Sequence, residues 1–99
     1  MNGNNIGSLL VNARYANGGA PVAGAKMTLR RDGEYIGEYY LGGDGKSDGI
    51  ILEPGEYSVS VTAPGFADSG EYVFPVMKNI TTLQNVSMFP NSGGGEGEI

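Results

Sequence analysis

The chain has 99 residues, which is enough for one domain with a single modest core. Its formal net charge is −5 and it has only six Lys and Arg residues, so a clustered basic surface for binding nucleic acid is excluded. It contains neither cysteine nor histidine, which excludes disulfides, thiol nucleophiles, Cys/His zinc sites and the commonest general base.

The start of the chain, MNGNNIGSLL, lacks the basic and apolar regions of a secretory signal peptide, and no apolar run approaches the length that crosses a bilayer. We therefore expect no membrane insertion. The localisation stays open, with a virion or an extracellular site reached by a non-classical route as one alternative. Composition predicts a polar N-terminal arm (1–5), a β-sandwich domain (6–90) and a Gly-rich acidic tail (91–99).

Period-two alternation predicts the first strands. In residues 7–15, Leu9, Val11, Ala13 and Tyr15 fall on one face and polar residues on the other, which is typical of a half-buried strand. Residues 26–31 alternate in the same way. The Asp-Gly pair that follows favours a hairpin turn, so residues 34–41 are expected to return as the paired strand.

The second half of the chain continues this pattern. A short apolar strand is expected at 49–52, and then Tyr57, Val59 and Val61 alternate with serines. Two more strands are predicted at 71–77, with Pro75 marking an edge or a bulge, and at 80–89. With many glycines and prolines at the turns and no helical period, the pattern predicts an all-β fold: a seven-stranded antiparallel Greek-key β-sandwich of the prealbumin-like or Ig-like type.

Four short segments occur in a suggestive order: PVAGA at 21–25, DGKS at 44–47, PGEY at 54–57, and Gly65 with Phe66. Over about residues 7–90, their order and spacing resemble the carboxypeptidase regulatory-like domain, a small sandwich of the transthyretin type. The resemblance implies a non-catalytic module that serves as an accessory or adhesion unit of something larger.

The PGEY turn and the APGF corner are also similar to the collagen-adhesin B-type repeat. Many such repeats carry a Lys–Asn isopeptide bond whose lysine lies in the first strand. Here the first predicted strand has no lysine, although Asn85 in the last strand stands where the resemblance implies an acceptor. No crosslink is therefore expected.

The stretch GGDGKSDG (42–49) suggests three kinds of loop. A phosphate-binding loop requires a glycine where Tyr40 stands, and it requires a helix after the loop. An EF-hand loop requires oxygen ligands where Lys46 and Gly55 stand. The pattern therefore predicts a turn, and it leaves open whether Asp44 and Asp48 hold a cation.

Tyrosines mark the remaining candidates. Tyr57, after LEPGE, resembles a tyrosine corner, in which the hydroxyl bonds to nearby backbone and pins a strand crossover. The strand at 34–41 carries more aromatic residues than one core face needs. Either Tyr35 and Tyr39 point inward, with Ile36 and Tyr40 outside, or the opposite register exposes Tyr35 and Tyr39. The candidate interaction surface comprises Tyr35, Ile36, Tyr39, Tyr40 and, as an apolar loop tip, Phe66.

These observations predict a protein that presents surfaces and performs no catalysis, with no cofactor and no metal. We expect a structural or accessory subunit of a larger assembly, such as a virion, a phage tail or an extracellular filament. Its partners would be other proteins or further copies of itself, and the open sheet edges offer one route to assembly. The alternative is a module that binds carbohydrate or a host surface through exposed tyrosines; an enzyme ranks third.

Overall fold

The protein is described by a computed structural model over residues 5–91, so all but the first residue of the predicted tail and all but the last residue of the predicted arm lie outside the described part. The described chain contains strands and no helix. The seven strands are β1 (Gly7–Tyr15), β2 (Lys26–Arg31), β3 (Glu34–Tyr40), β4 (Ile50–Leu52), β5 (Gly55–Thr62), β6 (Tyr72–Val76) and β7 (Thr81–Met88).

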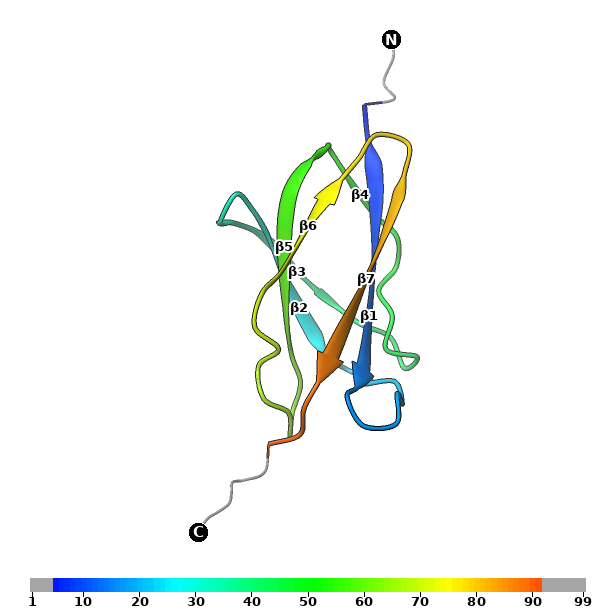
Figure 1. The fold of residues 1–99 in the computed structure, drawn as a ribbon, viewed down its shortest axis with the longest axis vertical. Coiled ribbons are helices and arrows are strands. Elements are labelled where there is room, and N and C mark those ends of the chain that lie inside the picture. The colour runs from blue at the N-terminus through cyan, green and yellow to red at the C-terminus, as the bar shows by residue number, and fades with distance from the viewer. Residues whose placement is uncertain (1–4, 92–99) are drawn as a thin grey trace.

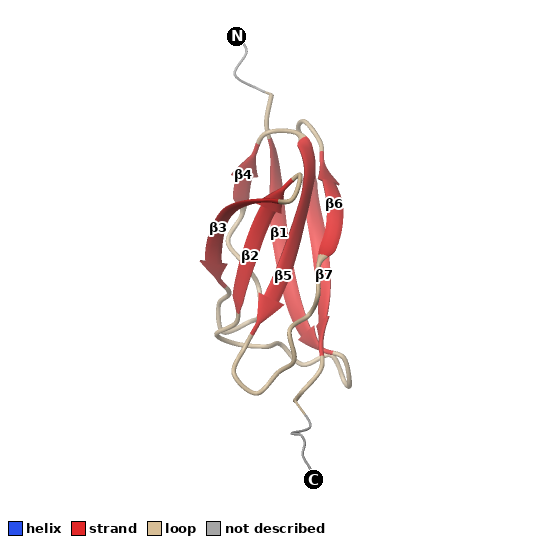
Figure 2. Ribbon diagram, turned by 90° about the vertical axis from the view of Figure 1, so that its left-hand side faces the viewer, coloured by secondary structure: helices blue, strands red, loops and turns tan. Residues whose placement is uncertain are grey.

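The strands form two packed sheets, so the predicted β-sandwich is confirmed (Figure 1). One sheet has three strands in the order β4-β1-β7, and the other has four in the order β3-β2-β5-β6. Figure 2 shows β2, β3 and β5 in front of β1 and β7. The chain changes sheet between β1 and β2, between β3 and β4, between β4 and β5, and between β6 and β7.

One pairing departs from the antiparallel expectation. Strands β1 and β7 run parallel, with Leu10 opposite Leu83 and Asn12 opposite Asn85, whereas every other strand pair is antiparallel. Period-two alternation is the same in either strand direction, so the pattern predicted both strands and the buried face of β1 but carried no information on their relative direction.

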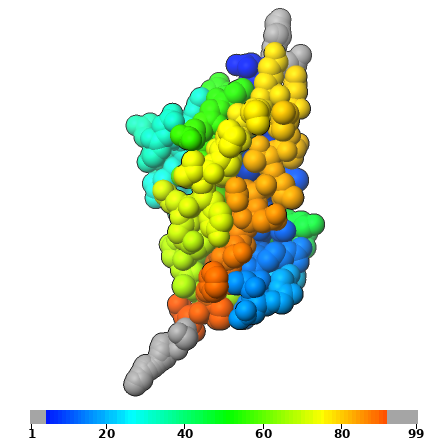
Figure 3. Space-filling view, viewed as in Figure 1, coloured from blue at the N-terminus to red at the C-terminus, as the bar shows by residue number. Residues whose placement is uncertain are grey.

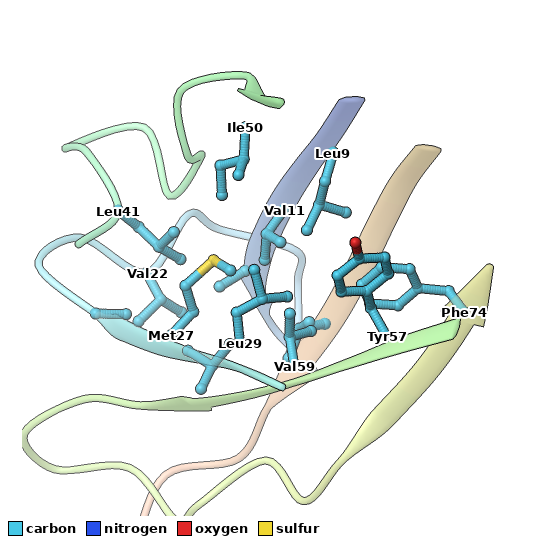
Figure 4. Close-up of a cluster of buried hydrophobic side chains, with 14 of the residues drawn as sticks. Leu9, Val11, Val22, Met27, Leu29, Leu41, Ile50, Tyr57, Val59 and Phe74 are labelled. Carbon is cyan, nitrogen blue, oxygen red and sulfur yellow. The ribbon is translucent and has the colours of Figure 1, made fainter. Parts of the chain in front are cut away.

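The core lies between the sheets and is built from the alternating positions that the pattern predicted (Figure 4). Strand β1 contributes Leu9, Val11 and Ala13, all fully buried, whereas Tyr15, predicted on the same face, is 37% exposed because it ends the strand at the rim of the core. The three buried residues face Met27 and Leu29 of β2, which are also fully buried, because β1 and β2 lie near the middle of their sheets. The rest of the buried core comes from the loops and the other strands: Val22, Ala25, Leu41, Ile50, Tyr57, Val59, Val61, Phe74, Val76, Val86 and Met88.

Core packing generates a first prediction. Replacing Leu29 by Ala removes a fully buried side chain from the centre of β2 and leaves a cavity between the sheets. We expect the free energy of unfolding to fall by about 3 kcal/mol. Leu10→Ala, at a half-buried position on the outer face of β1, is the matched control and should cost about 1 kcal/mol. Urea unfolding of the three proteins measures both values, and similar losses for the two variants would contradict this account of the core.

Candidate functional site

The candidate interaction surface lies on β3, at one edge of the four-stranded sheet. Along the β2–β3 ladder, Leu29 lies opposite Gly37, yet the next residue of β2, Arg30, lies opposite Tyr35. Ile36 is therefore an extra residue, which makes this position a β-bulge. A bulge interrupts the alternation of side chains between the two faces of a strand, so the residues before and after it follow different registers.

The bulge overturns both registers that the sequence allowed. Tyr39 lies opposite the buried Met27 and packs against the core. Tyr40 lies opposite Lys26 on the outer face and is 72% exposed. Without the bulge, Tyr35 would share the inner face with Tyr39, but it lies instead on the outer face and is 58% exposed. Strict alternation was the wrong assumption for this strand.

We call the exposed residues of β3 the tyrosine surface: Tyr35, Ile36 and Tyr40. The ion pair between Lys26 Nζ and Glu38 Oε2, 3.5 Å apart, lies beside it on the outer face. Both partners are solvent-exposed, so the pair contributes little to stability. Two large tyrosine rings and an isoleucine that the core does not use can be buried by a partner, while the flanking charges remain at the rim of the contact.

Phe66 does not form the exposed tip that the sequence suggested. Its ring is half-buried, packs against the core, and meets the ring of Tyr15 edge to face at a centroid distance of 4.9 Å. Its backbone N–H donates to the Ala63 carbonyl at 3.0 Å, and Phe66 forms an isolated bridge with Pro90. Phe66 therefore closes one end of the sandwich, and the more exposed aromatic residues near that end are Phe89, at 60%, and Tyr15, at 37%.

The GGDGKSDG stretch is a turn, as predicted. The Asp44 carboxylate accepts the backbone N–H of Lys46 at 3.0 Å, and the Gly42 N–H donates to the Lys46 carbonyl at 2.9 Å. Gly45 has a φ of 77°, and a Cβ there would lie 2.6 Å from the Ala13 carbonyl oxygen, so only glycine fits this close approach. The buried hydroxyl of Ser47 then accepts the Val11 N–H at 2.9 Å, which ties the turn to β1.

The cation that the sequence left open at Asp44 and Asp48 gains no support. Asp44 uses one carboxylate oxygen to cap the turn. Within residues 5–91, no group of three or more Asp, Glu, His or Cys side chains is placed to hold a metal ion. Asp48 instead lines a shallow hollow beside Tyr39 and Tyr40, between β3 and the segment that leads into β4. This hollow extends the tyrosine surface toward the other sheet.

Tyr57 forms the predicted tyrosine corner. Its hydroxyl donates to the Glu53 carbonyl, four residues upstream, at 2.6 Å. The Arg31 guanidinium lies 5.5 Å from the centre of the Tyr57 ring and donates to the Pro54 carbonyl at 3.0 Å. Burial raises the pKa of the hydroxyl above its ordinary value of 10.0; Arg31 opposes this rise, and the carboxylates of Glu53 and Asp32 add to it. These contacts fix the crossover from β4 to β5.

Asn85, the residue that the adhesin resemblance singled out, lies exposed on β7. Its side-chain oxygen accepts a hydrogen bond from the Asn12 amide at 3.0 Å. Asn12 is its register partner in β1, so an asparagine and not a lysine stands beside it.

Sequence analysis missed a second set of exposed apolar residues, which lie on or beside the three-stranded sheet. Ile51 of β4 is 63% exposed, Leu83 of β7 is 58% exposed, and Ile80 follows at 47%. One feature of the sequence could have indicated this apolar surface. Residues 79–91 contain no Asp, Glu, Lys or Arg, which is unusual in a chain with 17 charged residues. The pattern predicted a strand at 80–89 and did not distinguish its two faces.

Comparisons with known proteins identify the fold. No family model matches the chain, and no curated protein matches it in sequence. Among solved structures, it is similar to the minor pilin GBS52 of Streptococcus agalactiae, with a TM-score of 0.75 and 16% identity over 96% of this chain and 48% of that one. It is similar to the shaft pilin SpaA of Lactobacillus rhamnosus GG, with a TM-score of 0.70 and 12% identity over 94% of this chain and 49% of that one.

A third similar structure belongs to an enzyme. The 5-hydroxyisourate hydrolase of Klebsiella pneumoniae has a TM-score of 0.60 and 16% identity over 87% of this chain and 99% of that chain. All three identities are low, so they establish a shared sandwich of the pilin and transthyretin-like type and nothing about activity. The chain spans about half the length of the two pilins. No family model supports the more specific resemblances to carboxypeptidase regulatory-like domains and to B-type repeats.

The described part of the chain contains no helix long and apolar enough to cross a membrane.

The tyrosine corner generates a second prediction. Tyr57→Phe removes the hydrogen bond to the Glu53 carbonyl, so we expect unfolding to become easier by about 1–2 kcal/mol at neutral pH. The folded pKa of Tyr57 is raised, so the folded state retains the proton longer than the unfolded state. This stabilisation is present below pH 10.0 and is lost as the pH rises through the folded pKa.

Chemical denaturation of both proteins at about pH 8 and about pH 11 measures this effect. The difference between wild type and Tyr57→Phe should shrink at the higher pH. A difference that stays constant or grows would contradict the assigned role of the hydroxyl.

Proposed function

We propose that this chain is a non-catalytic structural or adhesion-type module that acts through protein–protein contacts. The tyrosine surface carries the proposal: Tyr35, Ile36 and Tyr40 project from an edge strand, and the bulge at Ile36 brings the first of these rings to the outer face. Tyrosine is enriched at interfaces because it offers a large rigid area with a polar tip. The fold shared with pilin domains supports the same class of function.

The acidic residues support binding in preference to chemistry. Three of the carboxylates are engaged in surface ion pairs, namely Glu38 with Lys26, Glu53 with Arg31, and Glu71 with Arg30. An acid–base pair for hydrolysis requires two carboxyl groups that flank one substrate-sized cleft in distinct environments. Asp32, Glu56 and Glu71 do line one hollow beside β5, but Glu71 is engaged with Arg30. We propose no enzymatic activity for this chain, and the activity in the name of the Klebsiella hydrolase is not carried over to it.

Within this class we favour a subunit of a larger assembly. Of the settings considered, namely a virion, a phage tail and an extracellular filament, the filament is favoured because shaft and minor pilins share the fold. In such a setting the tyrosine surface would contact a neighbouring subunit. The two rings flank Lys26 and Glu38, so the partner surface should be apolar at its centre and polar at its rim.

Carbohydrate binding is the second candidate. Tyr40 is 72% exposed and stands beside the Lys26–Glu38 pair, so a flat ring and hydrogen-bonding groups lie together on one face. A sugar ring could stack on such a tyrosine while its hydroxyls bind the charged side chains. The same residues would then serve a glycan partner.

The third prediction separates these functions. In the double variant Tyr35→Ser/Tyr40→Ser, we expect the affinity for a protein partner to fall more than tenfold, because each ring supplies buried area at the contact. Retention of proteins from an extract of the source organism on the immobilised chain, followed by titration of the retained partner, measures the loss. Ile51→Ser is the matched control, since Ile51 is equally exposed but lies on the other sheet.

A glycan array tested with the same three proteins decides the alternative. Glycan binding that disappears only in the double tyrosine variant would support the carbohydrate function. If the tyrosine changes alter neither protein nor glycan binding, the tyrosine surface is not the functional site and the proposal fails.

A further inference from the structure

The two sheets present four edge strands, and three of these edges are obstructed. Strand β4 has only three residues. Strand β3 carries the bulge at Ile36 and the acidic residues Glu34 and Glu38. Strand β6 contains Pro75, so its predicted place at an edge is confirmed. Short length, bulges, charges and proline are the features by which edge strands avoid pairing with other chains.

Pro75 blocks its edge directly. Its carbonyl accepts the Thr82 hydroxyl of β7 at 3.1 Å, so it points away from β5. In an antiparallel strand the nitrogen and carbonyl of one residue point to the same side. The missing N–H of Pro75 therefore also lies on the open edge of β6, where a pairing strand would need it.

Strand β7 has none of these features among the edges that residues 5–91 form. It has eight residues, TTLQNVSM, without a charge, a proline or a bulge. Figure 3 shows its atoms, in yellow-orange to orange, at the surface along the near side of the molecule. A long uncharged edge of this kind is a template for another strand.

The backbone of β7 has a defined open side. The N–H of Ser8 donates to the Ile80 carbonyl at 3.1 Å, and that of Ala16 donates to the Met88 carbonyl at 2.8 Å. In a parallel ladder the even-numbered residues of β7 therefore bond to β1, and the odd-numbered residues point away from it.

Two of the outward-pointing groups already have partners. The Ser87 N–H donates to the Tyr72 hydroxyl at 3.2 Å, and the Asn85 carbonyl accepts the Gln84 side-chain amide at 2.8 Å. The Asn85 carbonyl keeps a second acceptor lone pair. The stretch of the edge that can still pair thus runs from Thr81 to Asn85 and is centred on Leu83.

We propose that two copies of this chain associate by antiparallel pairing of their β7 edges about a two-fold axis at Leu83. Leu83 then lies opposite Leu83 of the second copy, and Thr81 lies opposite Asn85 of the second copy. These are the residues whose N–H and C=O groups point outward, so each opposed pair exchanges two hydrogen bonds. The result is a continuous six-stranded sheet in the order β4-β1-β7-β7-β1-β4.

The distribution of charge along the chain supports a second copy as the partner of the β7 edge. Each chain carries a net charge of −5, so two copies repel each other over most approaches. The stretch 79–91 has no charged residue, so this approach brings no like charges into opposition. Leu10 is the register partner of Leu83, and the axis aligns Leu10 and Leu83 of one copy with those of the other. The 58% exposed Leu83 is buried by this alignment.

This inference deepens the proposed assembly function and rests on it, but it uses a different surface from the tyrosines. A single short strand pairing buries less than the roughly 800 Å² per partner of a typical stable interface. The dimer is therefore expected to form as concentration rises, and to strengthen where neighbouring subunits hold two copies together.

Sedimentation velocity across concentrations from about 1 μM to about 1 mM tests the proposal. Wild type should shift from monomer to dimer. In Leu83→Lys, two lysines meet at the axis, so the shift should be lost while the circular dichroism spectrum is unchanged. Ile51→Lys adds the same charge to the outer face of the same sheet, on the opposite edge strand, and should dimerise like wild type.

Disulfide formation tests directly whether residue 83 of one copy lies opposite residue 83 of the other. The chain has no cysteine, so Leu83→Cys introduces a single thiol. Opposed hydrogen-bonded residues lie about 5.5 Å apart between Cα atoms, which a disulfide can span. Mild oxidation should convert Leu83→Cys to a covalent dimer at least tenfold faster than Ile51→Cys.

A monomer at all concentrations, or dimerisation that survives Leu83→Lys, would overturn the β7 pairing. Neither result bears on the tyrosine surface, whose test uses Tyr35 and Tyr40. Conversely, if the tyrosine variants lose no partner while Leu83→Lys abolishes dimerisation, the proposed tyrosine site fails and the β7 pairing stands.

Discussion

Burial of one face of β1 against the facing side of β2 and β5 is the constraint on which the rest of this structure depends. Leu9 and Val11 on one sheet, and Leu29 and Val59 on the other, are fully excluded from water. Most of the stability of so small a domain must come from this layer of side chains. Because the central strands satisfy the core, the edge strands are left to differ from one another, and the surfaces available for binding lie there.

The four edge strands of this sandwich differ in whether they can pair with a strand of another chain. Strand β3 uses a bulge and acidic residues, and the bulge also brings Tyr35 to the outer face. Strand β6 carries Pro75 at its open side, and β4 is too short to pair extensively. Strand β7 has none of these features within the described chain. Features that prevent uncontrolled pairing at three edges direct any pairing to the fourth.

The candidate site shows where prediction from sequence succeeded and where it stopped. The number of strands, the buried alternation and the tyrosine corner followed from local patterns, and the structure confirms them. The orientation of Tyr35 did not follow, since the bulge depends on which residue of β2 lies opposite each residue of β3. Phe66 looked like a free loop tip because nothing near it in sequence reveals that it packs against Tyr15.

By itself, the sequence determined the buried faces of β1, β2 and β5 and where the chain turns. A side chain's polarity and the conformational freedom of glycine act locally, so alternation and turn residues can be read without knowing the partners of a strand. Only the tertiary structure decided that β7 runs parallel to β1, that Ile36 bulges, and which four strands lie at the edges. Strand direction, register and neighbours are set by contacts between residues far apart in the chain, and an alternating pattern is compatible with several of them.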